Sequence, residues 1–101
     1  MSKNNEQRLP PQSTESERAV LGCILIDTKA FPRACQYINQ DSFYKKTHSI
    51  IFSAMEDLDE DGDSIDNVTL IEKLKQKKQL DVVGGAYFIT GLSSEAPTAA
   101  N

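Results

Sequence analysis

The run Asp57–Gly62 carries carboxylates at the spacing of the first half of an EF-hand calcium loop. Such a loop also needs a bidentate carboxylate at its twelfth position, and that position is Val68 in this sequence. Ile65 and Asp66 moreover fall where a new helix is expected to begin, not where a ligand loop would continue. We therefore interpret the run as the solvated acidic end of a helix and expect no calcium site.

The other reactive side chains assemble no recognisable catalytic or metal site. His48 is the only histidine, and its place in the first turn of an expected helix favours a packing or surface role over catalysis. Cys23 and Cys35 match no zinc or CxxC spacing, so we expect free thiols. Gly84-Gly85 is followed by Ala and Tyr, not by the Lys and hydroxyl residue of a phosphate loop. The sequence thus predicts neither an enzyme nor a cofactor or metal in this chain.

One basic segment has two open interpretations, a solvated helix face or a weak nucleic-acid patch. The chain has 11 Lys and Arg against 15 Asp and Glu, a net charge of −4, which argues against binding nucleic acid mainly through bulk charge. No Arg or aromatic residue interleaves the lysines, so we favour the solvated face. The lysines are Lys73, Lys75, Lys77 and Lys78.

Apolar residues recur at helical spacing along the chain, and no segment alternates as a strand would. The fold class predicted is all-α, a compact orthogonal bundle of about five to six short helices. Gly22 inside an apolar helix indicates a close crossing with another helix, and Phe43-Tyr44 is expected to plug into the core as a pair. Five helices are expected to begin at a capping box of Thr14 and Glu17, at Asp27-Thr28, at Thr47, at Asp66, and after Gly84-Gly85. Pro32 would fall in the first turn of the second helix. Gly62 is expected to end the third helix in a left-handed conformation, and Pro97 follows the last helix.

The first twelve residues are polar and contain Pro10-Pro11, so we expect residues 1–12 to form a flexible tail before a helical head over 13–101. The longest run without polar side chains, Ala19–Ile26, has eight residues, too few for a membrane helix, which needs about 20. No apolar segment follows the charges of the N-terminus, so no secretory signal is expected. We therefore expect a cytoplasmic protein without membrane contact.

An ordered series of short patterns resembles the N-terminal domain of the bacterial hexameric replicative DNA helicase of the DnaB type. Pro32, Ser64 and Gly91 depart from the usual pattern of that family. The matching residues are Leu9–Ser13, Glu15, Glu17, Ala19–Gly22, Phe43-Tyr44, His48, Ile51-Phe52, Met55, Gly62, Ile65-Asp66, Val68–Leu70, Gln79-Leu80, Gly84-Gly85 and Pro97–Asn101.

The resemblance implies a non-catalytic head that organises the helicase ring and docks the C-terminal domain of primase, a helicase loader, or both. The motor, with its ATP and Mg, and the contact with DNA would belong to the longer parent protein, which pairs its subunits through a helical hairpin beyond Asn101. We therefore expect the isolated chain to be monomeric. Two alternatives stay open: a small DNA-binding module using Lys73–Lys78, and a free-standing regulatory mimic of the helicase head.

Three side chains are the candidate partner contacts. Tyr87, Phe88 and Ile89 are consecutive in an expected helix and spread over about 200° of arc, so they cannot all face one core. At least one of Tyr87 and Phe88 should therefore be partly exposed. Glu15 is expected to point outward from the first helix and to join this aromatic in the surface that binds primase or loader. The alternative is an aromatic pair shared between the core and the neighbouring truncated edge.

Overall fold

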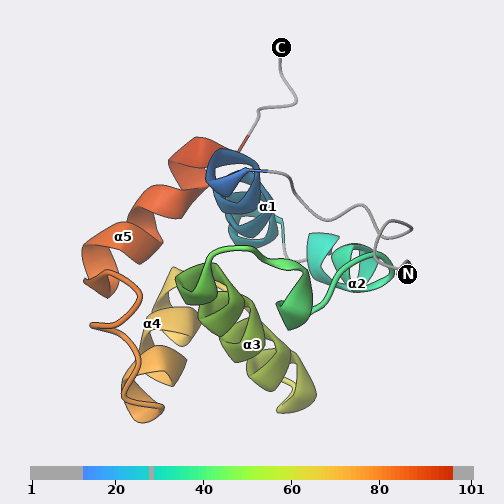
Figure 1. The fold of residues 1–101 in the computed structure, drawn as a ribbon. Helices are drawn as coiled ribbons and strands as arrows, with labels where there is room; N and C mark the ends of the chain where they lie inside the picture. Colours follow the sequence, from blue (N-terminus) through green and yellow to red (C-terminus); the bar gives the residue numbers. More distant parts are fainter. Residues whose placement is uncertain (1–12, 28, 97–101) are drawn as a thin grey trace.

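The computed structural model describes residues 13–27 and 29–96, and every regular element within those ranges is helical (Figure 1). The predicted all-α class is therefore confirmed. None of these helices is both long and apolar enough to cross a membrane. The tail over 1–12, Thr28 and Pro97 lie outside the described residues. The elements are α1 (Thr14–Ile26), α2 (Ala30–Cys35), the 3-10 helix η2 (Gln40–Ser42), α3 (Lys46–Glu60), α4 (Asn67–Gln76), α5 (Gly85–Gly91) and the 3-10 helix η3 (Leu92–Glu95).

Helix α1 begins at a different cap from the one predicted. The side chain of Ser13 accepts a hydrogen bond from the backbone N–H of Ser16 at 3.0 Å, so Ser13 is the N-cap. The capping box of Thr14 and Glu17 is therefore wrong. Glu17 does not reach back to the start of its helix, because its side chain is buried between α1 and α3.

The second helix is shorter than predicted and is not capped by Asp27-Thr28. The side chain of Asp27 accepts a hydrogen bond from the backbone N–H of Lys29 at 3.1 Å, a local turn that delays the helix, and Lys29 becomes the N-cap. Pro32 lies in the first turn, as expected, where its missing N–H costs nothing. The helix ends before Ile38, which still packs against the core from the loop that follows.

The predicted end of α3, at Gly62, and the predicted start of α4, at Asp66, are confirmed. Gly62 follows α3 with φ of 78°, a left-handed conformation that suits glycine. Asp66 caps α4 by accepting a hydrogen bond from the backbone N–H of Thr69 at 2.9 Å, while the Thr69 hydroxyl accepts one from the backbone N–H of Asp66 at 3.0 Å. The hydrogen bond from the Thr69 backbone also lowers the pKa of Asp66.

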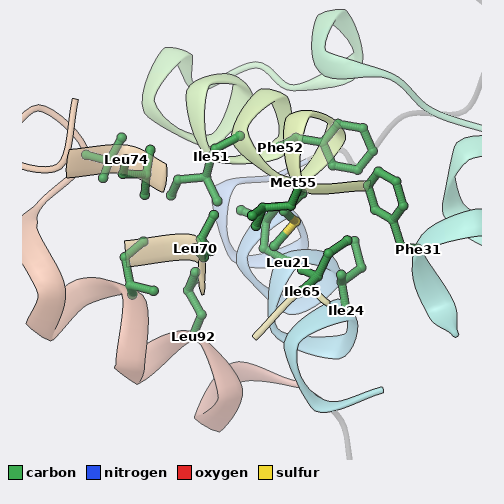
Figure 2. Packing of buried hydrophobic residues seen from close by; sticks show 14 of the residues in the cluster. Leu21, Ile24, Phe31, Ile51, Phe52, Met55, Ile65, Leu70, Leu74 and Leu92 are labelled. Atoms are coloured by element: carbon green, nitrogen blue, oxygen red, sulfur yellow. The ribbon is translucent and has the colours of Figure 1, made fainter. Parts of the chain in front are cut away.

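One core joins all the helices, and Figure 2 shows its side chains meeting between α1, α3 and α4. Its aromatic part centres on Phe52, whose ring lies 5.4 Å from that of Phe31 and 5.3 Å from that of Phe43. Tyr44, however, is 88% exposed, so the prediction of a buried aromatic pair is half wrong. Phe43 has an extended backbone, in which consecutive side chains point to opposite sides.

The first and last elements of the described chain pack together, and Gly22 lies at their crossing, where the sequence predicted a close approach to another helix. Figure 1 shows the start of α1 beside the end of η3. A Cβ on Gly22 would lie 2.1 Å from the carbonyl oxygen of Leu92, far closer than a Cβ comes to a non-bonded heavy atom. Glycine at this position is thus what permits the close approach of α1 to η3.

Candidate interaction surface

A surface groove of about 410 Å³ lies where α1 meets α5 and η3, and it contains both predicted aromatic residues. Tyr87 is 91% exposed, and Phe88 is half-buried against the core. Arg18 of α1 and Glu95 of η3 also line the groove and form an ion pair with a nitrogen–oxygen distance of 3.7 Å. The groove therefore presents one nearly free aromatic ring beside a charged pair.

Glu15 lies on the same side of α1 as the groove but does not line it. It is three residues before Arg18, and residues at this spacing share one face of a helix. Its side chain is exposed in the first turn, as expected. Tyr87 and Phe88 are therefore brought together, and Glu15 adds a negative charge about one helical turn away along α1.

Behind the groove, the ring of Phe88 stacks on that of His48, with centroids 6.3 Å apart and planes 14° from parallel. The Nδ1 atom of His48 donates to Glu17 Oε1 at 2.7 Å. The Glu17 carboxylate also accepts the backbone N–H of Tyr44 at 2.6 Å and that of Lys45 at 3.3 Å. Glu17 and His48 are both fully buried. This Glu17–His48 clamp joins α1 to the start of α3 and supports the ring of Phe88.

The clamp is built for positioning and not for catalysis. An acid–base pair acts on a substrate only within hydrogen-bond reach, and both residues are fully buried. The interpretation of His48 as a packing residue agrees with its burial. The buried role of Glu17 was not predicted, because a carboxylate in the first turn of a helix is already explained by the favourable interaction with the helix dipole. The signal was its spacing, since Glu17, Leu21 and Ile24 fall on one helical face.

The basic segment does not form one free cationic face, because two of its lysines pair with the acidic end of α3. Lys73 Nζ lies 2.9 Å from Asp61 Oδ2, and Lys77 pairs with Asp57. The hydrogen bond from Lys73 to Asp61 raises the pKa of Lys73. These two carboxylates, Asp57 and Asp61, are the first and fifth residues of the run that resembled an EF-hand loop.

Lys75 and Lys78 are exposed and line a separate hollow with Leu80 and Asp81. The lysine segment is therefore divided between an intramolecular charge pairing and a solvated face. Among the residues of 13–27 and 29–96, no three His, Cys, Asp or Glu side chains gather closely enough to hold a metal ion.

Comparison with known proteins gives a consistent result for the whole chain. The DnaB-like helicase N terminal domain family matches residues 9–101. The replicative DNA helicase DnaB of Geobacillus stearothermophilus is 38% identical over all of this chain, and the replicative DNA helicase DnaC of Bacillus subtilis (strain 168) is 39% identical over 93% of it. The chain spans only 22% and 21% of those two relatives.

A solved structure agrees with these sequence matches. The crystal structure of the N-terminal domain of DnaB helicase from Mycobacterium tuberculosis superimposes with a TM-score of 0.83 at 33% sequence identity, covering 92% of this chain and 65% of that one. The fold, its helical order and the sequence match all lead to one assignment. The chain belongs to the DnaB-like helicase N-terminal domain family.

Proposed function

We propose that this chain is a non-catalytic interaction head of a replicative DNA helicase. The names and lengths of its relatives support this, because about four-fifths of each of the two helicases named above lies outside the region the chain spans. The ATPase motor, with ATP and Mg, and the contact with DNA would lie in that remainder. The head would dock primase or a helicase loader and would organise the subunits of the ring in the cytoplasm.

The observation that carries the proposal is the exposure of Tyr87 in the groove. Cores of small domains consume most large apolar side chains, and aromatic residues left at a surface are enriched among the residues that dominate binding energy. Phe88 supplies a second aromatic surface and is held in place by its stacking on His48. Glu15 would add a charge that steers a basic partner. A helical partner such as the primase C-terminal domain would insert an apolar side chain between these groups.

Titration of the labelled chain with the primase C-terminal domain tests this surface. We expect Tyr87→Ala to weaken binding at least tenfold, the size of effect typical of a buried aromatic anchor. Glu15→Ala should weaken it less and mainly by slowing association. Tyr44→Ala is the matched control, because Tyr44 is almost as exposed as Tyr87 but is not among the residues that line the groove. If Tyr87→Ala and Glu15→Ala both fold and bind like the parent chain, the proposed surface is wrong.

The DNA-binding alternative is less well supported. Lys73 and Lys77 are already paired with carboxylates, so within the described part of the chain only two lysines of the segment Lys73–Lys78 have no ion-pair partner. We propose that the isolated chain is a monomer that neither hydrolyses ATP nor retains DNA at physiological salt. A tight dimer in sedimentation, ATP turnover, or salt-dependent DNA binding that Lys75→Ala and Lys78→Ala abolish would contradict this.

A further inference from the structure

A second surface groove, of about 400 Å³, lies between the end of α3 and the exposed face of α4. It shares no lining residue with the groove at Tyr87. Leu58, which is buried, and Val68, which is 76% exposed at the start of α4, form its apolar part. This α3–α4 groove therefore offers an aliphatic surface that the core of the domain does not use.

The charges that line the α3–α4 groove are predominantly negative. Asp61, Asp63 and Glu72 contribute carboxylates, and among the described lining residues Lys73 alone carries a positive charge. The ammonium group of Lys73 already lies 2.9 Å from Asp61 Oδ2. Asp63 and Glu72 are exposed, and neither has an ion-pair partner within residues 13–27 and 29–96. Two carboxylates beside the aliphatic surface are thus accessible to a cationic ligand.

The dipoles of the two helices do not offset this negative charge. The end of α3 is the negative end of its dipole, yet its last turn contains Asp59 and Glu60 and no basic residue. The start of α4 is the positive end of its dipole, but the side chain of Asp66 already accepts a hydrogen bond from the backbone there. The region around the groove therefore favours a positively charged ligand.

Lys73 responds to the electrostatic potential of the α3–α4 groove. Its hydrogen bond to Asp61 raises its pKa, and the charges of Asp57 and Asp63 raise the pKa further. The groove thus stabilises the charged form of a basic side chain. A basic side chain supplied by a ligand at the same place would be stabilised in the same way.

The shape of the groove is fixed by the turn after α3 and by one face of α4. The backbone N–H of Asp63 donates to the carbonyl of Leu58 at 2.9 Å, which holds the turn against the end of α3. Val68, Glu72 and Gln76 follow one another at four-residue spacing and so share one face of α4. This face is about 12 Å long, a length that about four residues of extended chain span.

We propose that the α3–α4 groove docks a short basic segment of a partner protein, with one aliphatic side chain against Val68 and arginine side chains on Asp63 and Glu72. Charge complementarity selects this occupant, because an acidic or uncharged segment would cover the two carboxylates without pairing them. Guanidinium groups suit these positions, since they pair with a carboxylate through two hydrogen bonds at once. The proposal does not depend on docking at Tyr87.

Titration of the isotope-labelled chain with capped peptides, followed by NMR, tests the proposal. The probe is Arg-Arg-Leu-Arg-Arg, and its matched probes are Arg-Arg-Ser-Arg-Arg, which keeps the charge, and Glu-Glu-Leu-Glu-Glu, which reverses it. We expect the basic leucine peptide to bind about fivefold more tightly than the serine peptide at physiological salt, because its aliphatic side chain leaves water. Its binding should shift the amide signals of Val68 and Glu72, and the acidic peptide should shift neither.

Variants of the groove separate its two contributions. Asp63→Asn combined with Glu72→Gln should weaken binding of the leucine peptide about fivefold, the effect expected for the loss of two exposed ion pairs. Val68→Thr keeps the shape of an exposed side chain and should remove most of the preference for leucine over serine. Asp41→Asn combined with Asp81→Asn is the matched control, because both residues are exposed and neither lines the groove. This control should leave the affinity within about twofold of that of the parent chain, since it changes only the net charge.

Equal affinity of the parent chain for the leucine and serine peptides overturns the proposal, because the attraction would then be one of charge alone. Equal losses in the two double variants overturn it as well. Shifts of the Val68 amide that grow with protein concentration in the absence of peptide also overturn it, because the groove would then bind a second copy of the chain. The comparison of peptides uses the parent chain, so it decides the question even if a variant fails to fold.

Discussion

Removal of the Glu17 carboxylate should destabilise the domain far more than removal of Glu15, two residues earlier in the same helical turn. Glu17 accepts hydrogen bonds from the backbone N–H groups of Tyr44 and Lys45 and from the ring of His48, and its side chain is fully buried. Glu15 is exposed to solvent. Comparison of the unfolding free energies of Glu17→Ala and Glu15→Ala therefore distinguishes the contribution of the buried clamp from the general effect of a negative charge near the start of α1.

The size of the loss follows from the contacts that remain. Glu17→Ala leaves three donors without their acceptor, and each buried donor left unsatisfied costs about 1–3 kcal/mol. The two backbone donors are only partly buried and can be rehydrated, so the His48 ring carries most of the cost. Removal of one member of a buried pair typically costs about 3–5 kcal/mol, a large share of the about 5–15 kcal/mol that stabilises a domain.

Urea unfolding followed by circular dichroism at 222 nm measures the two free energies. We expect Glu17→Ala to lose about 3–5 kcal/mol and Glu15→Ala to stay within about 0.5 kcal/mol of the parent chain. Glu17→Gln keeps the shape and part of the hydrogen bonding, so its loss should lie between the two. If Glu17→Ala loses less than about 1 kcal/mol, or no more than Glu15→Ala, the clamp does not stabilise the fold and the reasoning fails.

Three further changes test local features by thermal or urea unfolding. Gly22→Ala should lower the free energy of unfolding by about 1–3 kcal/mol, despite the better helix propensity of alanine, because the new Cβ would collide with the backbone carbonyl of Leu92. A more stable variant would contradict the close crossing. Gly84→Ala should cost about 1–3 kcal/mol, since Gly84 has φ of 114°, and an unchanged midpoint would argue against that backbone conformation. Asp66→Ala should cost about 1 kcal/mol at pH 7. Hydrogen bonds from Thr69 lower the pKa of Asp66, so the stability that Asp66 contributes is complete above the ordinary carboxyl pKa and is lost as the pH falls through the lowered value. The difference in unfolding free energy between the parent chain and Asp66→Ala should therefore vanish in acid. A difference that persists in acid would refute this assignment.

The features that the sequence predicted correctly depend on local chemistry. Asp66 followed by Thr69 is a capping pattern complete within four residues, and Gly62 needs only its own left-handed conformation to end α3. The divergence of Tyr87 and Phe88 follows from the geometry of one helix. Gly22 is an intermediate case, because its lack of a side chain signals a close approach without identifying η3 as the neighbour.

The features that were missed depend on residues far apart in the chain. The acceptor role of Glu17 is decided by His48 and by the backbone at Tyr44, more than 25 residues away, so the first turn alone suggested a helix cap. Lys73 looked like part of a basic patch because its partner, Asp61, is the C-cap residue of another helix, α3. Side chains that meet across a tertiary contact leave only a weak trace in a single sequence, such as a carboxylate on an otherwise apolar face.

The crossing of α1 and η3 has a consequence for the time at which the fold can form. Leu92 leaves the ribosome about 70 residues after Gly22, so α1 must wait, without its main packing partner, while most of the domain is synthesised. Helices α3 and α4 can meet earlier because they are neighbours in the chain. The apolar face of α1, with Leu21 and Ile24, is meanwhile available to any chaperone that recognises nascent chains. Completion of the core is thus tied to the synthesis of η3, the last helical element of the described residues.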